Sequence, residues 1–124
     1  MQDYDAARFD PPAPLALVTL KSEQLGIVIN DVPMLLDTGA DVSLLPRALG
    51  APLALPDAIL YELESFDGTK CTAPSVTAEL LFLGKSFRGQ FLLIDNWYGI
   101  LGRNILNNLS ILLDGPSRKW SQQR

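Results

Sequence analysis

The chain has 124 residues, of which 48% are hydrophobic and 19% charged, and its formal net charge is −4. This length and balance predict a single domain with a packed core and exclude a disordered chain. The sequence contains no histidine, which excludes Ser–His and Cys–His nucleophilic catalysis and most zinc sites. An acidic balance without a basic run argues against nucleic acid as a partner.

From the sequence we also expect neither a membrane-spanning segment nor a signal peptide. No segment approaches 18 uninterrupted apolar residues, so no membrane partner is expected. Residues 1–5 are acidic and do not resemble a signal peptide. The single cysteine, Cys71, cannot form an intrachain disulfide. We therefore expect a cytoplasmic protein.

The first part of the chain reads as a lead-in followed by short strands. Residues 1–14 are rich in proline near their end and predict an extended, poorly ordered segment. Asn30 and Asp31 predict a turn, and Pro46 is expected to end a strand. The strands predicted in this half are 15–20, 25–29, 32–37 and 42–45.

Two hairpins and one helix are predicted in the second half. Asp67 and Gly68 lie between two extended runs, a strong hairpin signal because glycine adopts positive φ at low cost. A second hairpin is centred on Gly84. The elements expected here are strands 60–65, 70–73, 76–83 and 86–94, a loop at 95–99, a buried pair at 100–101, a helix at 103–109 and a strand at 110–113.

Short strands separated by frequent turns predict an all-β barrel or sandwich over residues 15–115. Residues 116–124 are expected to form a polar tail without regular structure.

One carboxylate stands out from this pattern. Asp37 follows three apolar residues and precedes Thr38 and Gly39. Carboxylates are rarely buried unless something pairs with them or uses them, although Asp and Gly are also common in ordinary turns. Farther along, residues 100–104 read Ile-Leu-Gly-Arg-Asn.

With these two motifs the chain resembles the retroviral-type aspartic proteases, the retropepsins, together with their cellular and bacterial relatives. The resemblance implies a closed β barrel with a flap hairpin, one short C-terminal helix, and a homodimer. A single Asp-Thr-Gly motif per chain means that the second carboxylate comes from a second copy. The implied activity is hydrolysis of peptide bonds in extended peptides or proteins, by water activated between two Asp37 carboxylates, with no metal or cofactor.

The resemblance also implies roles for individual residues. Asp37 is the expected catalytic residue, with Thr38 bridging to the partner's loop and Gly39 allowing the loop to turn. Asp41 and Arg103 are expected to form a partly buried structural ion pair, the alternative being a weak surface pair. The expected substrate-binding residues are Ala40, Asp41, Val42, Ile100 and the flap residues Phe66, Asp67, Gly68 and Thr69.

Several alternatives stay open at this point. The hairpin tip carries the acidic Asp67 where viral flaps are richer in glycine, and the alternative to a flap is an ordinary exposed hairpin. Trp97 and Tyr98 are expected either to line a substrate subsite or to pack in the core or at its rim. The alternative function is a catalytically silent retropepsin-like dimerisation or peptide-binding module. A chance motif in an unrelated β domain would predict a monomer.

Overall fold

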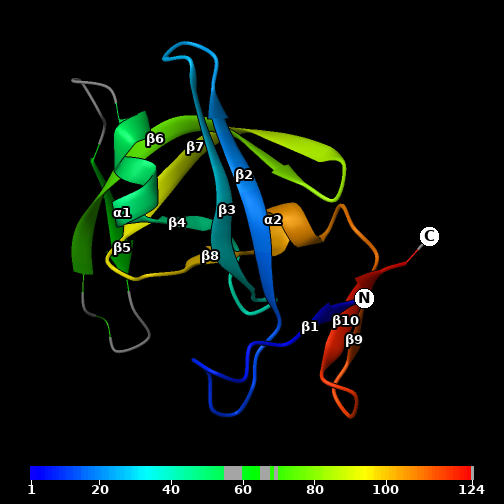
Figure 1. Cartoon of the computed structure of the whole chain (residues 1–124). Coiled ribbons are helices and arrows are strands. Elements are labelled where there is room, and N and C mark those ends of the chain that lie inside the picture. Colours follow the sequence, from blue (N-terminus) through cyan, green and yellow to red (C-terminus); the bar gives the residue numbers. More distant parts are fainter. Residues whose placement is uncertain (55–59, 65–67, 69, 124) are drawn as a thin grey trace.

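Strands make up most of the computed structural model, which describes residues 1–54, 60–64, 68 and 70–123 (Figure 1). For residues 60–64 and 70–73 it describes the backbone alone. The elements in chain order are β1 (Gln2–Asp3), β2 (Leu15–Ser22), β3 (Ile27–Leu36), β4 (Leu44–Pro46), α1 (Arg47–Gly50), η1 (Ala51–Leu53), β5 (Leu60–Glu64), β6 (Lys70–Phe82), β7 (Lys85–Ile94), β8 (Gly99–Leu101), α2 (Arg103–Leu106), β9 (Ile111–Asp114) and β10 (Lys119–Gln122).

Six strands close into a barrel, as the resemblance implied. They follow the order β2-β3-β8-β4-β7-β6, and the antiparallel pairing of β2 with β6 closes the ring. β5 extends the sheet outward from β6 as the first strand of a hairpin. The short strand β8 lies between β3, to which it is parallel, and β4, to which it is antiparallel. This central position of β8 brings residues 99–102 against the end of β3.

The core fills the barrel and follows the period of two expected for strands with one buried face. On β2, Ala16, Val18 and Leu20 are buried, whereas Leu17 is 59% exposed. The largest fully buried side chains come from strands across the barrel, from η1 and from α2, and include Leu20, Met34, Leu45, Leu53, Leu80, Leu101 and Ile105. No helix among the described residues is long and apolar enough to cross a membrane.

The turns differ in how well the sequence predicted them. Leu83 and Gly84 both have positive φ and close the β6–β7 hairpin in two residues, the geometry that matches strand twist. The turn predicted at Asn30 and Asp31 is wrong, because β3 continues through both residues and the chain reverses at residues 23–26. Asp31 has a φ of 56°, and the register of β2 against β3 shifts in the same region. Residue types that are common in turns therefore occupy an irregular position within a strand here, as they can at a β-bulge.

The helices are shorter and more numerous than predicted. α2 ends at Leu106, three residues before the expected end, and single turns continue to Leu109. α1 and η1 follow Pro46 directly and were not predicted. Each spans about one turn, too short to display the helical period that a sequence pattern needs.

Strands form in both terminal segments of the described chain, where the sequence predicted a poorly ordered lead-in and an irregular tail. β1, β10 and β9 form a three-stranded antiparallel sheet beside the barrel, so that the two termini lie close together (Figure 1). Trp120 is only 2% exposed; its ring centroid lies 6.0 Å from that of Phe82, and its indole N–H donates to the Leu15 carbonyl at 3.2 Å. One buried aromatic residue thus anchors an otherwise polar tail.

Candidate active site

Asp37 sits at the first position after β3 and is held by its own loop. Its backbone N–H donates to the Leu101 carbonyl at 3.0 Å, which extends the pairing of β3 with β8. The Gly39 amide donates to Asp37 Oδ1 at 2.9 Å, and the Ala40 amide donates to the Asp37 carbonyl at 3.2 Å. The side chain is half-buried. Its carboxylate is therefore oriented by the loop while part of it faces solvent.

The loop after Asp37 packs directly on the backbone of Gly102. A Cβ atom at Gly102 would collide with the Val42 carbonyl and would lie 3.0 Å from the Ala40 carbonyl oxygen. Backbone hydrogen bonds run alongside: the Arg103 amide donates to the Ala40 carbonyl at 2.8 Å, and the Asn104 amide donates to the Asp41 carbonyl at 3.3 Å. Only glycine fits where these two backbone segments pack so closely, which explains why glycine stands at position 102, between the apolar pair and Arg103.

A buried polar network, which the sequence did not reveal, ties the same two segments together. Ser43 is 3% exposed. Its hydroxyl accepts a hydrogen bond from the Gly102 amide at 2.9 Å and donates to Asn104 Oδ1 at 2.8 Å. Buried polar groups are normally paired in this way. The only sequence signal was a serine inside an apolar run, which by itself does not identify a partner.

The predicted ion pair between Asp41 and Arg103 is wrong. Among the described residues these two side chains form no ion pair, and Arg103 Nη1 instead donates to the Thr38 carbonyl at 2.6 Å. Asp41 meets α2 through its backbone carbonyl, and its side chain is exposed. Local backbone hydrogen bonds thus replace the expected charge contact, with the guanidinium bracing the Asp-Thr-Gly loop.

The predicted site residues around Asp37 differ in how exposed they are. Thr38, Asp41 and Val42 are exposed beside Asp37, and Ala40 is half-buried. Ile100 is half-buried and pairs in register with Leu35 and Leu44. In the predicted flap, Gly68 is exposed with a φ of 82°, whereas Phe66, Asp67 and Thr69 lie outside the described residues.

An apolar hollow of about 230 Å³ adjoins the Asp37 loop. It opens between the end of β3, the segment after α2, and β9. The residues that line it are Leu36, Thr38, Leu106, Asn107, Leu109, Ile111 and Leu113. A surface of this kind next to the Asp37 loop is suited to contact with another apolar chain segment.

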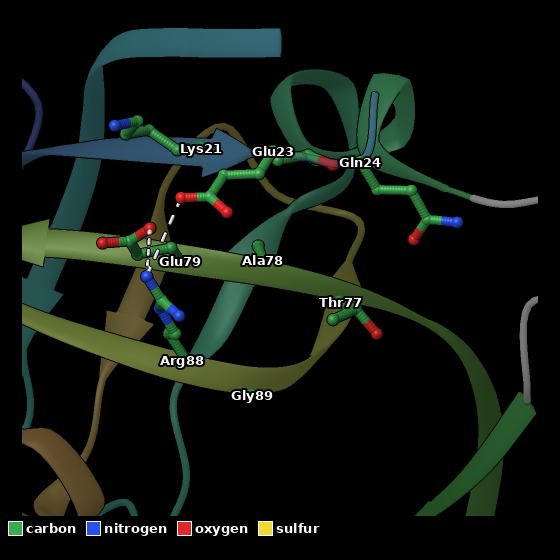
Figure 2. A pocket seen from close by; sticks show the side chains of 9 residues that line it. Lys21, Glu23, Gln24, Thr77, Ala78, Glu79, Arg88 and Gly89 are labelled. Carbon is green, nitrogen blue, oxygen red and sulfur yellow. Dashed lines mark ion pairs between the residues drawn. The ribbon is translucent and has the colours of Figure 1, made fainter. Parts of the chain in front are cut away.

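A second hollow, of about 280 Å³, is built from other residues and lacks a catalytic arrangement (Figure 2). It lies between the end of β2 and the β6–β7 pair, and Arg88 sits 3.8 Å from Glu23 and 3.7 Å from Glu79. Exposed pairs of this length contribute little free energy. Among the described residues no group of three or more His, Cys, Asp or Glu side chains could hold a metal ion.

Comparisons with known proteins agree with this geometry. A family model described as retroviral aspartyl protease matches residues 14–114. Among solved structures, EIAV protease in complex with the inhibitor HBY-793 superposes with a TM-score of 0.56 and 24% sequence identity, over 85% of this chain and 91% of that chain. At this identity the superposition supports the fold alone. No curated protein matches the chain.

Proposed function

The chain belongs to the retroviral aspartyl protease family, and we propose that it is an aspartic endopeptidase that hydrolyses peptide bonds as a homodimer. The observation that carries this proposal is the Asp37 carboxylate, which is oriented by the Gly39 amide and half-buried at the end of β3. An ordinary turn residue would not need two further segments, β8 and α2, packed against its loop.

The proposed chemistry needs two carboxylates that share one proton. One carboxylate takes a proton from water as the water oxygen attacks the peptide carbonyl carbon. The protonated partner donates its proton to the carbonyl oxygen. The tetrahedral intermediate then collapses, the C–N bond breaks, and the amine leaves with a proton from the pair. No metal or cofactor is required for any of these steps.

The need for a partner follows because each chain supplies one such loop. A two-fold axis beside the loop would place two Asp37 residues face to face and would make the interface self-complementary. The apolar hollow beside Thr38 supports this arrangement, as does the outer edge of β9, where Leu112 and Leu113 are 45% and 48% exposed. In the described chain β9 pairs only with β10, so its other edge is available.

The proposed substrate is an extended peptide or protein segment bound along the dimer cleft. Ala40, Asp41, Val42 and Ile100 would contact it from below. The β5–β6 hairpin, through Phe66, Asp67, Gly68 and Thr69, would cover it as a flap and exclude water. The exposure of Asp41 and Val42 beside Asp37 supports their part of this assignment.

The test is cleavage of a diverse peptide mixture between pH 4 and pH 7, read by mass spectrometry. Wild type is compared with Asp37→Asn and with Asp31→Asn, an exposed aspartate on the β2–β3 hairpin. We expect cuts from wild type and Asp31→Asn and none from Asp37→Asn. Sedimentation measured on the same samples should give a dimer for all three. A folded dimer that never cuts would contradict the proposal and favour a silent peptide-binding module.

A further inference from the structure

The N-terminal segment before β2, residues 5–14, is bound to the catalytic strand; we call it the strap. Asp5 and Ala13 form an antiparallel bridge, with N–H to O distances of 2.8 and 3.2 Å between their backbones. The Leu36 amide then donates to the Pro14 carbonyl at 3.0 Å. Leu36 is the residue before Asp37. The strap is therefore a closed loop whose base is attached next to the proposed catalytic residue.

The outer part of the strap contacts the loop that leads into β8. The ring centroid of Phe9 lies 5.6 Å from that of Trp97 and 5.1 Å from that of Tyr98, and the two latter rings are 4.7 Å apart. Tilted and edge-on arrangements at these distances are favourable for aromatic pairs. Tyr98 precedes Gly99, which pairs with Met34 on the catalytic strand β3.

Arg8 fixes Trp97 from a second direction. Its guanidinium carbon lies 4.0 Å from the centre of the Trp97 ring, a cation–π contact. Asp5 holds the guanidinium through two bonds, from Nε at 2.9 Å and from Nη2 at 2.8 Å. The other oxygen of Asp5 accepts the amides of Ala7 and Arg8. Trp97 nevertheless keeps 40% of its surface exposed, so an oriented aromatic side chain remains open to a ligand.

The following inference rests on the proposed function. We propose that the strap forms one wall of the substrate cleft. In this wall Arg8 and Phe9 hold Trp97 and Tyr98, which form a subsite for a large apolar or aromatic side chain of the peptide. Arg8 and Phe9 are positioning residues in this arrangement, because they act through the two rings. Trp97 contacts both Phe9 and Arg8 of the strap, and the part of its surface that stays exposed is available to contact a peptide side chain.

The variants that test the wall are Arg8→Ala and Phe9→Ala, with Phe9→Tyr as the conservative substitution that keeps a ring. Arg88→Ala is the matched control, because Arg88 is also exposed and paired with carboxylates, but at the hollow of Figure 2. Folding of each variant is checked by circular dichroism and thermal unfolding. The substrates are pairs of peptides that differ only by Phe or Ala beside the cut bond.

The readout is the ratio of kcat/KM for the Phe peptide to that for the Ala peptide. We expect this ratio to fall about tenfold in Arg8→Ala and Phe9→Ala, within the range for loss of an apolar subsite, and to stay at the wild-type value in Phe9→Tyr and Arg88→Ala. An unchanged ratio in both alanine variants would overturn the proposal, even if both peptides were cut more slowly. A uniform loss of rate indicates a structural role alone.

Binding of the same peptides to the Asp37→Asn protein separates this inference from the proposed function. If wild type cuts nothing, the proposed function fails, and the binding preference for Phe over Ala still decides the role of the strap. A preference that Phe9→Ala removes in the Asp37→Asn background supports the wall. Equal binding of both peptides, or no binding of either, overturns it.

Discussion

Ser43 and Gly102 are joined by a buried hydrogen bond, in which the Gly102 amide donates to the Ser43 hydroxyl at 2.9 Å. The two residues are far apart in sequence, one after the Asp37 loop and the other before α2. Because Ser43 also donates to Asn104 Oδ1, one hydroxyl joins the segment after the Asp37 loop to two residues at the start of α2. The position of the proposed catalytic loop thus depends on a residue that carries no charge.

Replacing this hydroxyl should therefore destabilise the fold. Ser43→Ala leaves the buried Gly102 amide without its acceptor, which costs about 1–3 kcal/mol in the free energy of unfolding. The matched control is Ser86→Ala, since the Ser86 hydroxyl donates to Glu79 on the surface, where we expect a change within about 0.5 kcal/mol. Urea unfolding measures both. Equal effects of the two substitutions would contradict the role assigned to Ser43.

Gly102 should tolerate no side chain. In Gly102→Ala the new Cβ meets two backbone carbonyls that cannot move away independently, so we expect a loss of about 3 kcal/mol or more, or failure to fold. Gly89→Ala is the control, because nothing lies within 4 Å of the point that a Cβ atom would occupy at this position on β7. Thermal unfolding of the two variants should differ by many degrees. A Gly102→Ala protein as stable as Gly89→Ala would mean that the loop is not packed as described.

The edge of β9 should control self-association if the proposed dimer forms there. Leu113→Asp places a charge next to the apolar hollow and on an exposed edge strand, and burying that charge without a partner is costly. We expect the dimer to dissociate and peptide cleavage to be lost with it. Leu17→Asp alters a leucine on β2 that is also exposed and should leave the dimer intact. Sedimentation velocity over a range of protein concentrations distinguishes the two.

Acid should loosen the strap. Hydrogen bonds from the Arg8 backbone amide, and then from the Arg8 side chain, hold the pKa of Asp5 below its usual range. Because the pKa of Asp5 is lowered in the folded state, its ionised carboxylate contributes to folding stability above the unfolded pKa of about 3.9. This contribution is lost as the pH falls through the folded-state pKa.

The protonation of Asp5 and the loosening of the strap can be followed at individual backbone amides. NMR signals of the Ala7 and Arg8 amides should shift below about pH 4 in wild type and remain insensitive to pH in Asp5→Asn. Asp3→Asn provides the control. The Asp3 pKa is also lowered, by its hydrogen bond and charge contact with Lys119, but this pair lies in the terminal sheet. If Asp3→Asn, and not Asp5→Asn, removed the shift, the strap assignment would be contradicted.

The C-terminal residues should be needed for stability although their sequence is polar. Trp120→Ala removes a ring that is almost fully buried against Phe82 and Leu15, for which we expect about 3–5 kcal/mol. Trp97→Ala removes the second tryptophan, which is 40% exposed, and should cost much less. Chemical denaturation checks the difference. Comparable losses would show that the terminal sheet does not bury Trp120 in solution.

Local patterns in the sequence predicted most of the barrel correctly. A short run of β-forming residues located β2, and Gly84 located the β6–β7 hairpin, whose turn has positive φ at both residues in the structure. The prediction was wrong where the same local sequence is compatible with two different structures. Asn30 and Asp31 suit a turn, yet here they occupy an irregular position inside β3. The single turn of α1 is too short for any periodic signal.

The all-β class, the family and the position of Asp37 could be read from the amino-acid sequence, because these depend on short motifs and on a two-residue period. Three contacts emerged only from the folded chain: Arg103 donates to the Thr38 carbonyl in place of pairing with Asp41, Ser43 meets Gly102, and both termini share one sheet. Each of these contacts joins segments remote in the chain. Their pairing depends on how the closed barrel and its strand register bring the segments together, information that no local pattern contains.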